Sequence, residues 1–327
     1  MMEIRQAKKV DEAAILAFLD THWQKGHVFV RHPELLRWQH QDPDDAEALT
    51  FVLALRDGEL LGLLGFIPFR RFDPAADWKD LALAVWKVRD DAAAPGLGLQ
   101  LLNTVKRIRR PDLICAVGIS DMVVPIYRAL GYTVGPMAHA ALFPEIGPDG
   151  PAGGVPDVAR EHASGAGKLT ITRKLPENLP PVASRPRKSL DYLRARYAEH
   201  PWYEYQFAHN DDALLVLRKV DSPKGAVLRI VDLVGDAGAL ASCTPALRAL
   251  TREQECAYLD LVHYGVPDEA LPGWVEVREH AELVLPNYFE PFEQRNVPLR
   301  MAFKAGAGSL PIRLLRGDTD QDRPNRL

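Results

Sequence analysis

The sequence predicts an α+β fold of two similar domains, each a mixed, mostly antiparallel sheet flanked by helices. The chain has 327 residues, 47% of them hydrophobic, which exceeds what a single core usually serves. Helix-like and strand-like patterns alternate through residues 1–145, and a similar order of patterns returns over residues 188–305. Residues 146–187 are rich in Pro, Gly and Ala and predict a linker region.

The first half begins with helical patterns and then changes to strands. Residues 11–20 place apolar side chains at helical spacing, and so does the segment around Leu35, Leu36 and Trp38. Two apolar runs then flank Asp57-Gly58, a dipeptide that favours a tight hairpin turn because both positions tolerate positive φ. We therefore expect two early helices followed by an antiparallel pair of strands.

A strand, a glycine loop and a helix come next. The apolar run at residues 81–88 predicts a buried strand, and the leucines of residues 94–108 recur at helical spacing. A short apolar strand is expected at residues 113–118, and a helix from Asp121 to the glycine at 131. The order is that of a sheet domain with one functional loop.

The glycine loop is the segment of the first half whose residues indicate a binding site. Gly96 and Gly98 stand at the start of the predicted helix, where unpaired backbone N–H groups and the helix dipole favour an anion. Glycine also lets the backbone approach a phosphate closely. A Gly-x-Gly bend before a helix also occurs for purely structural reasons, so the loop alone leaves both interpretations open.

Two longer segments resemble a known family. VRDDAAAPGLGLQLL (88–102) resembles the pyrophosphate-binding motif of Gcn5-related N-acetyltransferases (GNATs), and SDMVVPIYRALGYTVG (120–135) resembles their following helix. Ala93 stands where the family usually has Gln or Arg, which removes one phosphate contact. The resemblance implies tandem GNAT-like domains and acyl-coenzyme A as cosubstrate. It also implies that the first half binds this cosubstrate in two places. Free N–H groups near Lys87, Val88 and Arg89 would hold the thioester, and the loop of Gly96, Leu97, Gly98 and Leu99 would hold the pyrophosphate.

Further segments resemble a narrower group. Residues 22–43, 63–68 and 285–297 are similar to tandem-domain sugar N-acyltransferases, which acylate the amine of nucleotide-linked amino sugars in surface polysaccharide biosynthesis. In the family the tyrosine before the Leu-Gly-aromatic turn is often the acid for the departing thiolate, and that position is Tyr127. An amphipathic core tyrosine is the alternative for this residue.

The other candidate site residues have equally credible structural roles. His27 and Glu290 are candidates for a general base or sugar contact, against a structural histidine and a residue that orders a bend. Asp260 and His263 are weaker candidates. Stacking surfaces for a sugar or base could come from the aromatic residues Trp38, Tyr288 and Phe289, although core packing would explain each of them.

The second half repeats the order of elements without the cofactor loop. Gly235-Asp236-Ala237-Gly238 stands at the corresponding place, and its carboxylate would repel a pyrophosphate. We therefore assign coenzyme A to the first half. Acceptor binding, dimerisation or buttressing remains for the second half, and residues 306–327 are expected to be a flexible tail.

Composition and spacing argue against several other classes of protein. A net charge of −4 gives no basic field for nucleic acid, and no histidine, cysteine or carboxylate set has metal-ligand spacing. No signal peptide or membrane span is evident, so a cytoplasmic protein is expected, and its three cysteines are expected to be buried free thiols. The basic run at 106–110 predicts either a solvated helix end or a phosphate contact.

Three functions follow from these observations. The first is transfer of an acyl group from acyl-coenzyme A to a nucleotide-linked amino sugar, by direct attack and without an acyl-enzyme. The second keeps the fold but changes the acceptor to another small amine or a peptide. The third is a non-catalytic binding or assembly protein, and a homodimer is compatible with each of them.

Overall fold

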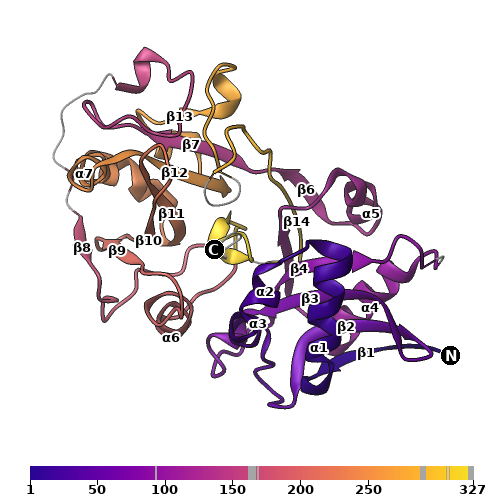
Figure 1. Ribbon diagram of the computed structural model, residues 1–327. Coiled ribbons are helices and arrows are strands. Elements are labelled where there is room, and N and C mark those ends of the chain that lie inside the picture. Colours follow the sequence, from indigo (N-terminus) through magenta and orange to yellow (C-terminus); the bar gives the residue numbers. More distant parts are fainter. Residues whose placement is uncertain are drawn as a thin grey trace.

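The computed structural model describes residues 1–92, 94–160, 167, 169–287, 292–306, 308 and 310–322. These residues form two mixed sheets flanked by helices, which confirms the predicted α+β class (Figure 1). Among them, no helix has the length and apolar character that a bilayer-spanning helix needs.

The first sheet has seven strands and carries helices on both faces. Short helices α1 (Glu12–Phe18), α2 (Val28–Arg31) and α3 (Pro33–His40) pack on one face. Helices α4 (Leu97–Arg109) and α5 (Val124–Ala129) cover the other. The strands lie in the spatial order β1 (Met2–Lys8), β2 (Ala48–Arg56), β3 (Glu59–Pro68), β4 (Asp80–Val88), β5 (Leu113–Val117), β14 (Arg300–Ala305) and β6 (Thr133–Pro136).

The sequence-based elements of the first half are confirmed, and the structure adds the short helix α2 and strand β1. The hairpin turn at Asp57 and Gly58 joins β2 to β3, and both residues have positive φ, 52° and 86°. Strand β1 was not predicted. It is a half-exposed edge strand whose sequence, MEIRQAK, lacks the apolar alternation of a buried strand.

The second sheet repeats this plan. Helix α7 (Leu240–Glu253) packs on one face, and α6 (Leu190–Leu193) continues as a wider turn to Ala198. The strands lie in the order β13 (Val275–Glu276), β7 (Ala138–Leu142), β12 (Cys256–Tyr264), β11 (Ala226–Gly235), β10 (Ala213–Val220), β9 (Gln206–His209) and β8 (Thr170–Thr172), and β15 (Leu314–Leu315) pairs with β12.

Each sheet takes a strand from the other half of the chain. Only Met137 separates β6 from β7, yet β6 is the edge of the first sheet and β7 pairs with β12 in the second. In return, β14 lies between β5 and β6 of the first sheet. The sheets therefore do not follow the predicted ranges 1–145 and 188–305, because long-range strand pairing exchanges residues 138–142 and 300–305.

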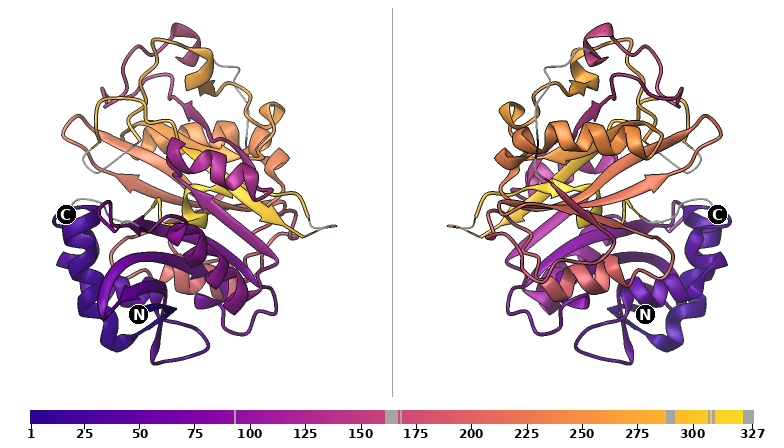
Figure 2. Two further views of the ribbon diagram at one scale, coloured as in Figure 1. Left: turned by 90° about the vertical axis from the view of Figure 1, so that its right-hand side faces the viewer. Right: turned by 90° about the vertical axis from the view of Figure 1, so that its left-hand side faces the viewer.

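The two halves also share one core. Ile67, Cys115 and Val117 of the first half pack in the same apolar cluster as Val216 and Val231 of the second. Burial of this area on both sides stabilises the halves against separation. Figure 2 shows the C-terminal part of the chain, in yellow, between them.

Buried ion pairs complete the junction between the halves. Lys188 lies 2.7 Å from Asp318 and forms a second ion pair with Asp232, and all three side chains are nearly inaccessible to water. Arg185 forms a buried ion pair with Asp80, the first residue of β4. The Arg185–Asp80 pair reaches the first sheet, whereas the Lys188 cluster ties the C-terminal segment to β11 of the second sheet. A buried charge that loses its partner is costly, so both contacts are strongly held.

The C-terminal segment fills a gap in the second sheet. The parallel pairing of β11 and β12 ends at Ile230 and Leu261, and the two strands then diverge. Beyond that point β15 pairs with the end of β12, and Arg313 donates from Nη2 to the Leu233 carbonyl of β11 at 3.1 Å. The chain's own segment thus occupies the space between the two diverging strands.

The expectation of a flexible tail at 306–327 is wrong for most of its described part. Residues 313–320 are buried, and Leu315 is completely inaccessible to water. The charged residues of this segment are not hydrated but form hydrogen bonds and ion pairs within the protein. For example, Arg196 donates to the Thr319 carbonyl at 2.8 Å, and Arg218 pairs with Asp322 at 2.8 Å.

We expect His200, at the junction of the halves, to make stability sensitive to acid. Burial lowers the pKa of His200 to about 3, whereas an unfolded histidine has a pKa of about 6.5. The unfolded chain therefore binds more protons between these values, and stability present above pH 6.5 is lost as the pH falls. The loss per histidine is about 1.4 kcal/mol per pH unit.

The variant His200→Asn tests this expectation. An asparagine oxygen can accept the N–H groups of Trp202 and Tyr203 that Nδ1 of His200 accepts now, at 3.1 and 2.9 Å. Between pH 4 and 6, the unfolding free energy of the variant, measured with urea, should change less with pH than that of wild type. The difference in slope should correspond to about one proton fewer taken up on unfolding. His280→Asn serves as the control, and equal slopes in wild type and His200→Asn would contradict the assignment.

Candidate active site

The first sheet opens between β4 and β5. Their parallel pairing runs only from Asp80 opposite Leu113 to Ala82 opposite Cys115, and the strands then diverge. A register irregularity between Leu64 and Phe66 of β3 adds a local bend to the β4 side of the gap. In the first half no described segment takes the place that β15 takes in the second sheet.

Main-chain groups of β4 face this gap. The Arg89 N–H donates to the Leu61 carbonyl at 2.9 Å, so it is directed at β3. Because hydrogen-bonded positions alternate along an antiparallel pair, Lys87 shares this direction and the Val88 N–H points to the other edge. Of the three residues predicted to hold a thioester, Val88 is therefore the one whose N–H faces the gap.

The glycine loop follows β4 directly and starts α4. Gly96 adopts a left-handed conformation with φ of 77°, and a side chain there would be strained. The Leu97 N–H donates to the Ala94 carbonyl at 3.1 Å, and the Gln100 N–H makes the first bond of the helix, to Gly96. Between them, the N–H groups of Gly98 and Leu99 have no hydrogen-bond acceptor among the described residues. Two unpaired donors at the positive end of a 13-residue helix favour an anion.

The cations beside the loop are matched by carboxylates. Lys87 pairs with Asp90 at 2.9 Å, and Arg89 pairs with Asp91 at 2.7 Å and with Glu59. The hydrogen bond from Arg89 lowers the pKa of Asp91 to about 2. Exposed ion pairs of this kind contribute little free energy. The backbone N–H groups of the loop, whose positions are fixed by the helix, are therefore the main anion-binding groups. Ala93 lies outside the described residues.

An aromatic cluster lies under the loop. The indole of Trp86, on β4, approaches Gly98 so closely that a Cβ there would lie 3.3 Å from Nε1. The Trp86 ring centroid is 5.8 Å from that of Tyr127, which in turn lies 5.0 Å from Tyr132. Burial raises the pKa of Tyr127, so its hydroxyl remains protonated and able to donate.

Trp86 was missed in the sequence analysis. It belongs to the same strand as Val88 and to the same apolar cluster as Tyr127, so it links the loop, the gap and the tyrosine. A large side chain two residues before the expected thioester contact was the available signal. Trp86, Val88 and Tyr127 thus share one cluster, with Gly98 against the Trp86 ring.

Other predicted residues lie elsewhere. His27 caps α2, where Nδ1 accepts the Phe29 N–H at 3.2 Å, and its side chain is buried. Trp38 packs against Phe72 and His200 between the halves. Tyr288, Phe289 and Glu290 lie outside the described residues.

Asp260 and His263 of the second sheet have structural surroundings. Asp260 is fully buried, pairs with Arg229 at 3.0 Å and lies 3.3 Å from His139. Burial lowers the pKa of His263 to about 4, so this histidine is neutral at pH 7. Neither residue belongs to the gap of the first sheet.

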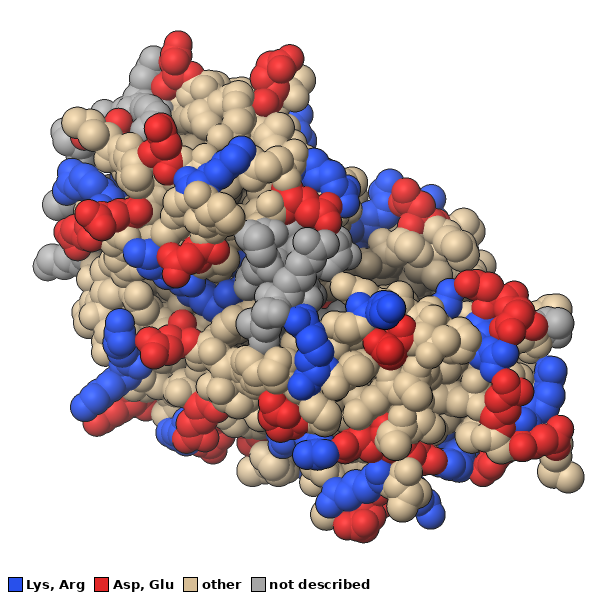
Figure 3. All heavy atoms as spheres, viewed as in Figure 1, with Lys and Arg blue, Asp and Glu red and all other residues tan. Residues whose placement is uncertain are grey.

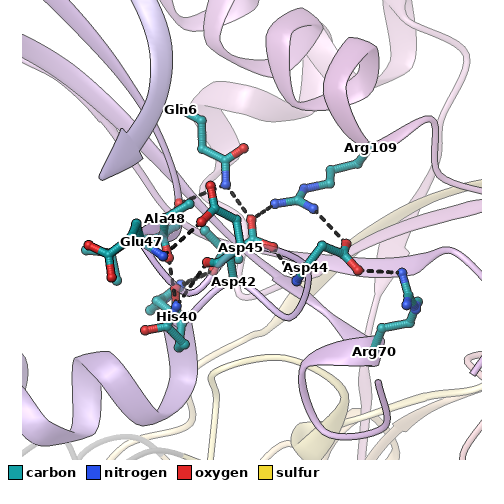
Figure 4. A network of polar contacts seen from close by, with 12 residues as sticks. Gln6, His40, Asp42, Asp44, Asp45, Glu47, Ala48, Arg70 and Arg109 are labelled. Atoms are coloured by element: carbon teal, nitrogen blue, oxygen red, sulfur yellow. Dashed lines mark hydrogen bonds and ion pairs between the residues drawn. The ribbon is translucent and has the colours of Figure 1, made fainter. Parts of the chain in front are cut away.

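The basic run at 106–110 ends α4, far from the loop. A 13-residue helix rises about 20 Å from end to end. Figure 4 shows Arg109 beside Asp42 and Asp44, and Asp44 also accepts from Arg70 at 2.9 Å. Arg109 therefore fits neither interpretation fully, because its side chain is only 16% exposed and pairs with carboxylates instead of water or a phosphate. Figure 3 shows acidic and basic side chains interspersed over one face of the molecule.

The corresponding loop of the second half is closed by its own side chain. Asp236 accepts the Gly238 N–H at 2.9 Å, which occupies a donor that an anion would need. The gap beside it holds β15, as described above. Both features agree with assigning the cofactor to the first half.

Metal ligation and thiol chemistry find no support in the described part of the chain. There, no group of three or more His, Cys, Asp and Glu side chains is placed to hold a metal ion. Cys115, Cys243 and Cys256 are buried free thiols, as predicted, and burial raises the pKa of each.

Comparisons with known proteins identify the architecture. No protein-family model matches the sequence, and no curated protein matches it. A GCN5-related N-acetyltransferase from Anabaena variabilis superposes with a TM-score of 0.57 at 10% identity, over 93% of this chain and 72% of that one. Another from Kribbella flavida gives 0.53 at 12% identity, over 93% and 71%. At these identities the likeness establishes the fold, and the chain has a tandem GNAT-like fold along nearly its whole length.

Proposed function

We propose that this protein is an N-acyltransferase that moves an acyl group from acyl-coenzyme A to an amine by direct attack. The observation that carries the proposal is the gap between β4 and β5, which leads to the unpaired N–H groups of Gly98 and Leu99 and lies beside buried Tyr127. The fold likeness is independent support. Among the described residues, a further strand of the chain, β15, occupies the gap of the second sheet and none occupies that of the first, so one site per chain is expected.

The residues of the gap fit the parts of such a cosubstrate. The helix start would hold the pyrophosphate, and Gly96 and Gly98 leave room for close approach of the backbone. The Val88 N–H would donate to the thioester oxygen as negative charge develops there. The loop lacks a side-chain cation of its own, so we expect affinity in the micromolar range or weaker.

Tyr127 is the proposed acid. In the transfer, the new bond forms between the amine nitrogen and the acyl carbon, the carbon–sulfur bond breaks, and the thiolate takes a proton from the Tyr127 hydroxyl. The amine loses its proton to solvent or, in the same step, to the tyrosine. His27 is fixed as a helix cap, so we do not assign it as base, and Glu290 stays a prediction.

For the acceptor we propose the amine of a nucleotide-linked amino sugar, which makes this a step of surface polysaccharide biosynthesis. The support is the resemblance of residues 22–43, 63–68 and 285–297 to tandem-domain sugar enzymes. Another small amine or a peptide would use the same gap, and a homodimer would be compatible with it.

Replacing Tyr127 by Phe should slow transfer at least about 100-fold at unchanged acetyl-coenzyme A affinity, since a general acid typically contributes about 10²- to 10⁴-fold. Thiol release at saturating cosubstrate measures the rate, and calorimetry measures the affinity. Tyr132→Phe is the matched control, because this neighbouring tyrosine also lies in the cluster and has a pKa raised to about 12. Full activity of Tyr127→Phe would remove the proposed acid.

The function itself is tested by incubating the protein with acetyl-coenzyme A and a panel of acceptors. The panel contains a nucleotide-linked amino sugar, a polyamine and a peptide with a free N-terminus, and thiol release is followed with mass spectrometry of the product. Acetylation of the sugar amine supports the full proposal, and acetylation of another amine corrects the acceptor. Cosubstrate binding without transfer to any amine favours the assembly-protein alternative.

A further inference from the structure

A glutamine near the C-terminus lies against the end of β5. Gly118 follows this strand with φ of 81°, and a Cβ built on it would lie 2.7 Å from Nε2 and 3.1 Å from Oε1 of Gln321. The carboxamide therefore packs flat on the Gly118 backbone. Any larger residue at 118 would displace it.

This position borders the gap of the first sheet. The last β4–β5 pair is Ala82 opposite Cys115, so Gly118 is three residues further along the diverging strand. Leu83 and Ala116 face α4 and Tyr127, whereas Cys115 and Val117 face the core shared with the second half. The C-terminal segment comes from that second side, opposite the glycine loop.

The backbone on both sides of Gln321 is anchored. The Thr319 carbonyl accepts from Arg196 at 2.8 Å, and Asp322 accepts from Tyr205 at 2.7 Å and from Arg218 at 2.8 Å. The side chain of Gln321 itself is half-buried, with Nε2 donating to Asp320 at 3.3 Å. No described residue donates to its Oε1. A partly accessible carboxamide is thus held on a fixed backbone beside the gap.

We propose that Gln321 lines the acceptor side of the acyl-transfer site, where the acyl group emerges from the gap. This inference rests on the proposed function. With one carboxamide oxygen available, Gln321 suits an acceptor that carries a hydroxyl or amide N–H beside its amine, and it suits a wholly cationic polyamine less well. One C-terminal segment thus fills the gap of the second sheet and forms a wall of the gap in the first.

The test uses the full chain with Gln321→Cys and needs no identified acceptor. Alkylation of the new thiol by N-ethylmaleimide is timed with and without acetyl-coenzyme A, and calorimetry on the same variant reports binding. The three native thiols are buried, with raised pKa values, and should not react. Gln294→Cys is the control, because Gln294 is exposed and its Oε1 accepts from exposed Lys224 at 2.8 Å.

We expect acetyl-coenzyme A at ten times its dissociation constant to slow alkylation of Cys at 321 about 10-fold, by mass action, and to leave position 294 unaffected. Butanoyl-coenzyme A should protect more than acetyl-coenzyme A, and free coenzyme A less. Binding without protection at 321 would overturn this inference alone, and so would equal protection at both positions or a thiol at 321 that never reacts. Absence of binding in wild type overturns the proposed function together with it.

Discussion

Gly98→Asp should weaken acetyl-coenzyme A binding at least 100-fold, about 3 kcal/mol. The substitution places a carboxylate where the helix start presents its unpaired N–H groups, so the side chain would both repel a pyrophosphate and accept these donors. The second half shows such an occupied donor, because the Asp236 carboxylate accepts the Gly238 N–H. Calorimetric titration measures the loss.

The control for this variant is Asn103→Asp. It adds the same charge to an exposed position of α4, beyond the first turn, where the helix N–H groups are already paired. Its affinity should stay within about threefold of wild type, since exposed charges interact weakly. Equal affinity of Gly98→Asp and wild type would show that no anion binds at the loop.

The largest expected effect on stability belongs to Lys188→Met. Lys188 is buried between Asp232 and Asp318, and the variant would leave two buried carboxylates without the lysine that pairs with both. Breaking a buried pair in this way costs about 3–5 kcal/mol of unfolding free energy. Burial already raises the pKa of Asp318 to about 6 with the lysine present, so the measurement belongs at pH 7.5, above that value.

Urea unfolding of Lys188→Met is compared with that of Lys224→Met, an exposed lysine whose loss should change stability by less than about 0.5 kcal/mol. Adding Asp318→Asn to Lys188→Met should restore part of the loss, because one of the two unpaired charges disappears. A loss below about 1 kcal/mol in the single variant would contradict the view that this cluster holds the C-terminal segment on β11.

Local patterns predicted most elements of this fold. The turn at Asp57 and Gly58 depends on two residues that tolerate positive φ, and the Gly98 loop depends on a strand pattern followed by a helical one. Such signals lie within about ten residues of one another, so a single sequence contains them. The roles of Val88, Gly98 and Tyr127 in one site were predicted from family resemblance, not from local patterns, and stay a prediction.

The exchange of strands and the course of the C-terminus could not be predicted. Residues 138–142 and 300–305 are apolar strands whose partners lie more than 100 residues away, and no periodicity specifies which edge they join. The charged residues of the C-terminal segment suggest solvent exposure, since charged side chains are rarely buried. Composition alone does not reveal that such a charge is buried in an ion pair, as Asp322 is with Arg218. Gln321 was missed for the same reason.

The central claim is that each chain has one acyl-coenzyme A site, in the gap between β4 and β5. Calorimetric titration of the wild-type protein with acetyl-coenzyme A tests it most directly. The account predicts saturable binding at one site per chain, lost in Gly98→Asp and retained in Asn103→Asp. Two equivalent sites per chain, or no binding at millimolar ligand, would contradict it.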